Sequence, residues 1–140
     1  MTDSTVTADR EELFAKLADP ATTGKFFERV SDSVSWTVEG THPLAGTYTS
    51  KQAFFDSTFA ILRPLMRDGL DLEVQNLHVA GDYTIAELDA IATTAEGVPF
   101  DNRYCWVCRF DGDLIVEVRA YLDSAMVAYV IGRADALSRN

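Results

Sequence analysis

Apolar residues recur at helical spacing in the first third of the chain. Asp9 and Glu12 have the spacing of a capping box, and the apolar positions that follow predict a helix that ends before residues 19–20. Phe26 and Phe27 indicate a second, short helix. The N-terminal part of the chain is therefore expected to be mainly helical.

A third helix is expected after a strand and a loop. Residues 34–38 alternate in strand fashion around Trp36, and glycines punctuate a loop over residues 40–46. Ser50 is a suitable cap for the helix that follows, and Pro64 should end or kink it.

From residue 70 onward the hydrophobic period changes from helical spacing to two. Within the first of these segments the apolar parity slips between Val74 and Leu77, which predicts a bulge. Turn signals, including 111–113, separate the segments that follow. Strands are expected over about 70–80, 83–94, 100–110 and 114–123, with a closing helix over about 125–136.

This order of elements predicts an α+β fold. Three helices followed by hairpin-linked strands favour a curved antiparallel sheet with helices over one face, and a pocket between the two layers. The 140 residues fit one domain spanning 1–140, with a core of about 9–133.

Composition and charge limit the classes of binding partner to be expected. The formal charge of -10 is spread along the chain and opposes phosphate backbones and anionic membranes, so neither nucleic acid nor a membrane is an expected partner. No apolar run is long enough to span a bilayer. The first residues lack the basic and apolar parts of a secretory signal, so we expect a cytoplasmic protein.

The two cysteines form a C-x-x-C string, but the surrounding residues are typical of a strand. Residues three apart on a strand point to opposite faces, so the thiols of Cys105 and Cys108 should diverge. We therefore expect no metal site and no redox role for this pair, which we interpret as two small hydrophobic residues.

Five strings along the chain carry a resemblance to known proteins: residues 34–36, 40–48, 101–104, 110–115 and 121–123. Taken in order, they resemble the SnoaL-like, ketosteroid-isomerase-related proteins of the nuclear-transport-factor-2-like superfamily. The resemblance runs from about residue 13 to residue 130 and implies a cone-shaped α+β fold that encloses a small-molecule pocket. It implies no single reaction, since this fold serves isomerases, cyclases, hydrolases, dehydratases and proteins without chemistry.

The chain departs from these relatives where they carry catalytic acids. Gly40 stands at the position of the aspartate base of ketosteroid isomerases, and Trp106 near that of their protonated aspartate. The resemblance places Ala120 at a position on the last strand where both the cyclases and the epoxide hydrolases have an inward carboxylate. The Arg-x-Asp of the epoxide hydrolases, on the middle strand, matches Glu87 and Asp89 here, so the aspartate is retained and a glutamate replaces the arginine.

Glu87 and Asp89 are the first catalytic candidates. Alternation places them on one strand face with Ile85 and Ile91. If that face lines the pocket, repulsion and desolvation would raise a carboxyl pKa, with Asp89 as acid or base and Glu87 as its tuning neighbour. Alternatively, the face meets solvent or its carboxylates pair with arginine.

Other candidates are aromatic or polar. Asn102, Tyr104 and Trp106 share a strand face that the resemblance directs inward, although core packing also explains Trp106. His42 could shuttle protons from its loop, or be merely exposed. The expected substrate contacts are Trp36, Tyr48, Phe55, Asn102, Tyr104 and Trp106.

Two functional hypotheses remain open at this stage. The first is a cofactor-free acid-base enzyme of isomerase, cyclase, hydratase or epoxide hydrolase type, acting on an apolar carbonyl, epoxide or polyketide-like compound. The second is a non-catalytic ligand-binding or dimerising domain of the same fold. In both, the expected partners are a small apolar molecule and a second copy of the chain.

Overall fold

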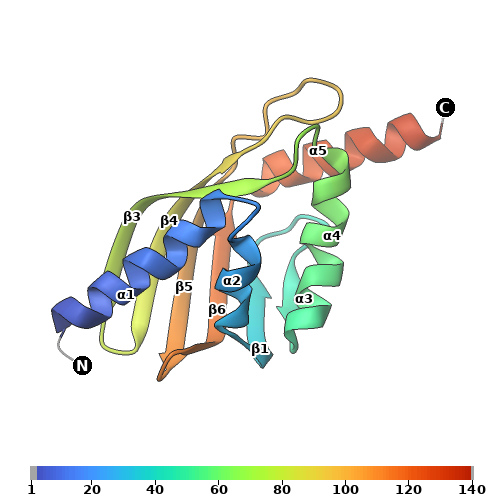
Figure 1. The fold of residues 1–140 in the computed structure, drawn as a ribbon. Helices are drawn as coiled ribbons and strands as arrows, with labels where there is room; N and C mark the ends of the chain where they lie inside the picture. The colour runs from blue at the N-terminus through green and yellow to red at the C-terminus, as the bar shows by residue number, and fades with distance from the viewer. Residues whose placement is uncertain (1–2, 140) are drawn as a thin grey trace.

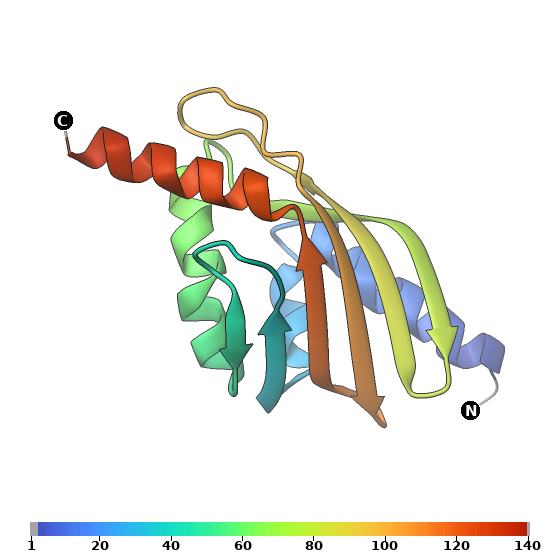
Figure 2. The same ribbon diagram turned by 180° about the vertical axis from the view of Figure 1, so that it is seen from behind.

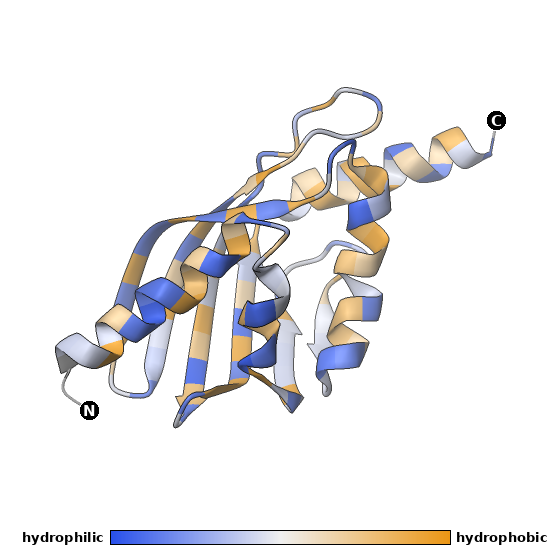
Figure 3. Ribbon diagram, in the orientation of Figure 1, coloured by the Kyte–Doolittle hydropathy of each residue, from blue (hydrophilic) through white to orange (hydrophobic). Residues whose placement is uncertain are grey.

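One curved sheet of six strands, with helices along one face, organises the computed structural model, which describes residues 3–139 (Figure 1). Apolar and polar residues alternate along the strands, as the bands in Figure 3 show. This alternation brings the buried side chains of the strands to one face of the sheet. The strands are β1 (Val30–Val38), β2 (Gly46–Tyr48), β3 (Asp71–Ala80), β4 (Tyr83–Ile91), β5 (Arg103–Asp111) and β6 (Leu114–Leu122).

The strand order is β2-β1-β6-β5-β4-β3. Hairpins join β3 to β4 and β5 to β6, and all neighbours are antiparallel except β1 and β6, which pair in parallel with Trp36 beside Val118. The expectation of a purely antiparallel sheet is thus wrong at this pair. Alternation predicts strands but not their direction, and no hairpin links β1 to β6.

The helices confirm the predicted fold class. Helices α1 to α4 lie over one face of the sheet, and Figure 2 shows the opposite face of the strands without a helix over it. Helix α5 leaves the end of β6 and extends away from the strands. The bounds are α1 (Asp3–Ala15), α2 (Thr23–Glu28), α3 (Lys51–Ser57), α4 (Phe59–Leu62) and α5 (Ser124–Ser138), with 3₁₀ turns at Lys16–Ala18 and Arg63–Leu65.

Helix ends follow the sequence signals unevenly. Ser50 caps α3 as predicted, with its Oγ accepting a hydrogen bond from the N–H of Ala53 at 3.0 Å. Pro64 lies in the 3₁₀ turn that ends this helical region. Asp9, however, is no N-cap, because α1 begins six residues earlier at Asp3 and the Asp9 carboxylate accepts a hydrogen bond from Arg29 instead.

The strands confirm one prediction and add one element. The bulge expected in β3 is present, as a register shift against β4 between Val74 and Asn76. The loop predicted over 40–46 is followed by a short strand that the sequence pattern did not indicate: β2 pairs antiparallel with β1, placing Tyr48 beside Trp36. Three residues are too few for a visible period of two.

Aromatic rings fill the space between the helices and the sheet. Trp36 is fully buried and stacks on Phe54 with ring centroids 3.9 Å apart. Phe26 and Phe27 of α2 pack against the same layer, edge to face with each other. In the described part of the chain, no helix combines the length and apolar character needed to cross a membrane.

Candidate small-molecule site

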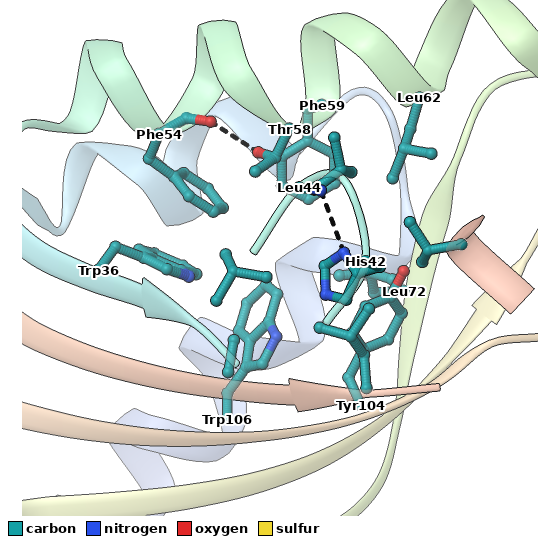
Figure 4. Close-up of a pocket in the computed structure, with 14 residues that line it drawn as sticks. Trp36, His42, Leu44, Phe54, Thr58, Phe59, Leu62, Leu72, Tyr104 and Trp106 are labelled. Carbon is teal, nitrogen blue, oxygen red and sulfur yellow. Dashed lines mark hydrogen bonds between the residues drawn. The ribbon is translucent and has the colours of Figure 1, made fainter. Parts of the chain in front are cut away.

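A cavity of about 40 Å³ lies between the helix-covered face of the sheet, helices α3 and α4, the loop that carries His42 and the first turn of α5 (Figure 4). Its walls are mostly apolar, which is typical of ligand pockets. The lining residues are Trp36, Val38, His42, Leu44, Phe54, Thr58, Phe59, Leu62, Leu72, Tyr104, Trp106, Ala120, Leu122 and Val127.

The cavity is small and is bounded on one side by two half-buried residues. A volume of about 40 Å³ holds about three or four water molecules at about 10–15 Å³ each, whereas a cavity that takes benzene measures about 150 Å³. Tyr104 and Leu122, neighbours across β5 and β6, are the half-buried members of the lining. An organic ligand therefore has to displace side chains, and this pair marks the entrance.

His42 is buried rather than exposed, with 5% of its surface accessible, and lines the cavity. Its Nδ1 accepts a hydrogen bond from the N–H of Leu44 at 3.2 Å, and its Nε2 lies 3.0 Å from the carbonyl oxygen of Glu39. Because Nδ1 is an acceptor, the proton is on Nε2, which donates to Glu39. The interpretation of an exposed loop histidine is wrong, because its backbone partners fold the ring inward.

Gly40 holds the loop of His42 close to α5. Its φ of 115° suits glycine, and a Cβ at this position would overlap Oγ of Ser124 and press on the His42 ring. The position of the ketosteroid isomerase base is thus occupied here by a close backbone contact. No acidic side chain fits at Gly40 without moving the loop.

Tyr104 presents a phenol hydroxyl to the cavity. Burial raises the pKa of Tyr104 far above its ordinary value, and the hydrogen bond of the neighbouring Asn102 amide offsets only part of this. The phenol therefore stays protonated across the physiological range and can donate a hydrogen bond to a ligand oxygen.

Asn102 is fully buried but does not line the cavity. Its Oδ1 accepts a hydrogen bond from the N–H of Asp123 at 2.9 Å, and its Nδ2 donates to the Asp123 carbonyl at 3.4 Å. Asp123 in turn caps α5. Asn102 was predicted to contact substrate; it instead fixes the start of α5 and lies beside the Tyr104 hydroxyl.

Trp36 and Trp106, both among the expected substrate contacts, form an aromatic wall of the cavity. Their rings meet edge to face, 5.1 Å apart at 84°, and both line the cavity. Within the described residues, the indole nitrogen of Trp36 has no hydrogen-bond partner. This donor is available to a ligand.

Tyr48 and Phe55, also predicted as substrate contacts, lie outside the lining. The Tyr48 hydroxyl donates to the carbonyl oxygen of Leu44 at 2.6 Å and so fixes the loop beside His42. Phe55 packs edge to face on Phe27 behind the cavity, 4.6 Å between ring centroids. A helix presents residues one position apart about 100° apart, so Phe54 faces the cavity and Phe55 does not.

Glu87 and Asp89 lie on the outer face of the sheet, away from the cavity. Glu87 is exposed and Asp89 half-buried, while Leu88 between them is buried on the helix side. The expectation that their face lines the pocket is wrong, because the helices cover the opposite face of β4, to which Leu88 belongs. Glu87 meets solvent, as one form of the alternative interpretation predicts, and Asp89 lies opposite Arg103, its register partner on β5.

The cavity contains no carboxylate among its described lining residues. Ala120 does line it, so the position that carries an inward acid in cyclases and epoxide hydrolases is inward here but apolar. Within residues 3–139, no three histidine, cysteine or acidic side chains gather into a metal-binding group. The polar groups at hand are therefore His42, Tyr104, Thr58 and Trp36.

The cysteines diverge as the strand pattern predicted. Cys108 is buried in the core, whereas Cys105 is half-buried beside Glu87, and both thiols are free. Burial, and then the charge of Glu87, raises the pKa of the Cys105 thiol.

The helical side of the lining was not predicted as part of a site. Thr58 lies where α3 passes into α4, and its hydroxyl donates to the carbonyl oxygen of Phe54 at 2.7 Å. In the sequence, Phe54 and Leu62 lie at helical spacing, which indicates a buried helix face. A pattern of this kind shows which face is buried but not that the neighbouring layer leaves a cavity.

Comparisons with known proteins place this geometry in a fold class. No protein-family model matches the sequence. An NTF2-like protein from Burkholderia thailandensis E264 has a similar structure, with a TM-score of 0.72 and 26% identity over 94% of this chain and 98% of that one. A protein of ketosteroid isomerase-like fold from Catenulispora acidiphila DSM 44928, in complex with trimethylamine, matches with a TM-score of 0.65 and 16% identity over 94% and 95%.

A relative of known name is the dimerizing cyclase phiC of Fungal sp. (strain ATCC 74256), which is 34% identical over 105 residues. The match covers 72% of this chain but 46% of that protein, so the chain matches about half of its relative's length. The predicted resemblance is confirmed at the level of the fold: the chain has the fold of the NTF2-like, ketosteroid-isomerase-like proteins.

Proposed function

We propose that the cavity binds a small, largely apolar compound that carries a carbonyl or hydroxyl oxygen, and that the chain isomerises or cyclises it without a cofactor. The observation that carries this proposal is the Tyr104 phenol, a neutral donor set in an otherwise apolar, aromatic-walled cavity. The similarity to a protein named a cyclase supports the same class of chemistry.

The chemistry would be a proton shift next to a carbonyl. Tyr104 would donate to the oxygen on which negative charge develops, where an enclosed donor is most effective. His42 is the lining residue with a basic ring nitrogen, and its Nδ1 would take the proton once ligand entry opens the 3.2 Å bond from Leu44. Asn102 would act through Tyr104 by holding its hydroxyl.

A second candidate is a ligand-binding domain without chemistry. It is favoured by two observations: no carboxylate is found among the described lining residues, and both ring nitrogens of His42 are occupied by backbone groups. In this case the cavity would bind the same class of compound and release it unchanged.

Cyclohex-3-enone distinguishes the two, because moving a proton from C2 to C4 brings its double bond into conjugation and changes its ultraviolet absorption. We expect saturable conversion by the wild-type protein, about tenfold to a hundredfold slower in Tyr104→Phe, which keeps the ring and removes the donor. Saturable binding without conversion would establish the binding domain. Failure of the probe to bind would contradict both.

We also propose that the chain forms a homodimer through the outer face of the sheet. That face has no helix over it in the described chain and exposes Ile91 (54%) and Tyr121 (45%). Sedimentation analysis tests this: wild-type protein should run as a dimer and Tyr121→Glu as a monomer. A monomeric wild-type protein at high concentration would contradict the proposal.

A further inference from the structure

Three of the aromatic rings that line the cavity, those of Trp36, Trp106 and Tyr104, form a row with a hydrogen-bond donor at each end. Trp106 lies between the other two, its ring centroid 5.1 Å from that of Trp36 and 6.4 Å from that of Tyr104. The Tyr104 end is the half-buried entrance, and the Trp36 end is completely closed to solvent. The cavity therefore has an entrance at Tyr104 and a closed, dry end at Trp36.

The donor at the dry end is unused. Trp36 is fully buried, yet its indole N–H has no hydrogen-bond partner among the described residues. An indole nitrogen can only donate, and buried tryptophans usually find an acceptor. Figure 4 shows the nitrogen-bearing end of the Trp36 ring directed toward the middle of the lining residues. The nearby face of Trp106 offers at most a weak acceptor.

The position of this N–H is tightly set. Trp36 stacks on Phe54 at 3.9 Å and 19°, and its strand pairs with β6 on one side and β2 on the other. A ring held in this way cannot turn to find a partner elsewhere. An unsatisfied donor in a fixed, dry position favours a ligand that brings an oxygen to it.

We propose that the Trp36 N–H binds an acceptor oxygen at the closed end of the cavity, so that the site selects compounds with one oxygen at each end, such as a diketone or a hydroxyketone. This rests on the proposed function and deepens it. Tyr104 then serves the oxygen at the entrance, and the flat apolar body of the ligand lies along Trp106.

The chain has two tryptophans, so its indole N–H region contains two signals, which Trp36→Phe assigns. We would titrate the wild-type protein with cyclohexane-1,4-dione, cyclohexanone and methylenecyclohexane. We expect the dione to move the Trp36 N–H signal downfield, as a hydrogen bond to oxygen does, and the hydrocarbon to leave it in place. Equal shifts with dione and hydrocarbon would overturn the inference.

Affinities in the variant give a second measurement. In Trp36→Phe, the ratio of dione affinity to cyclohexanone affinity should fall about fivefold, the value of one neutral hydrogen bond. An unchanged ratio, with all three probes bound, would contradict the role of Trp36 and leave the proposed function intact. If no probe binds, the proposed function itself fails. If the variant does not fold, the wild-type titration decides.

Discussion

The imidazole of His42 and the backbone N–H of Leu44 are joined by a 3.2 Å hydrogen bond, in which the ring nitrogen Nδ1 is the acceptor. This bond closes the loop that forms one wall of the cavity, and the Glu39 carbonyl completes it on the other ring nitrogen. The histidine is therefore a structural clamp, and in the proposed reaction it is also the base.

We expect His42→Ala to destabilise the protein by about 1–3 kcal/mol, because it leaves the Leu44 N–H and the Glu39 carbonyl without partners in a buried loop. Urea unfolding measures this. His78→Ala is the matched control, since His78 is exposed and should change stability by less than about 0.5 kcal/mol. Equal effects of the two substitutions would contradict the clamp.

Gly40→Ala tests the close approach of the loop to α5. A Cβ here would overlap Ser124 Oγ in addition to straining φ, so we expect a loss of about 2–4 kcal/mol. Gly81→Ala, at a positive φ with open space around it, should lose about 1 kcal/mol. Adding Ser124→Ala to Gly40→Ala should recover part of the difference, and no recovery would place the strain elsewhere.

The ion pair between Asp9 and Arg29 should make stability depend on pH in the acid range. The hydrogen bond from Arg29, with help from Arg10, holds the pKa of Asp9 below its ordinary value of 3.8. Because the pKa of Asp9 is lowered in the folded state, this carboxylate stabilises the fold at pH values above its unfolded-state pKa. That stabilisation is lost as the pH falls through the folded-state pKa.

The measurement is the stability difference between wild type and Asp9→Asn, from urea unfolding. It should be largest at about pH 6 and shrink toward zero at about pH 3 and below. Asp82→Asn is the control, because it removes a carboxylate in an exposed turn and leaves the pair of Asp9 and Arg29 intact. A difference that grows on acidification would contradict the assignment.

Tyr104 should titrate last among the five tyrosines, because burial raises its pKa. Because the pKa of Tyr104 is raised in the folded state, the contribution of its phenol to stability is intact below the unfolded-state pKa of 10.0. That contribution is lost as the pH rises above 10.0 toward the folded-state pKa. Ultraviolet titration should therefore lose its highest step in Tyr104→Phe. Loss of an ordinary step near pH 10 would show that the phenol is solvated.

Sequence patterns predicted most elements but not which strand parity lies inside. Glu87 and Asp89 were placed correctly on one face of β4, yet alternation is symmetrical and only the helices covering Leu88 decide the inner side. The resemblance did better for Ala120, because an aligned strand carries its orientation with it.

His42 shows what sequence could not predict at all. Its burial depends on the close approach of Gly40 to Ser124 and on the Tyr48 hydroxyl bound to Leu44, contacts that are set by tertiary packing. The same holds for Phe55, whose neighbour Phe54 took the cavity position. Local patterns give a residue's face, whereas a cavity depends on what the opposite layer leaves empty.

The proposed ligand, a small and largely apolar compound, is expected to bind in the cavity between the sheet and helices α3 and α4. The most direct measurement is a methyl-resolved NMR titration with cyclohexanone, comparing cavity methyls such as those of Leu62 and Leu122 with outer-face methyls such as those of Ile85 and Ile91. We expect saturable chemical-shift changes that are confined to the cavity methyls and are the same in Asp89→Asn as in the wild-type protein. Shifts centred on the outer face, or lost in Asp89→Asn, would contradict this expectation.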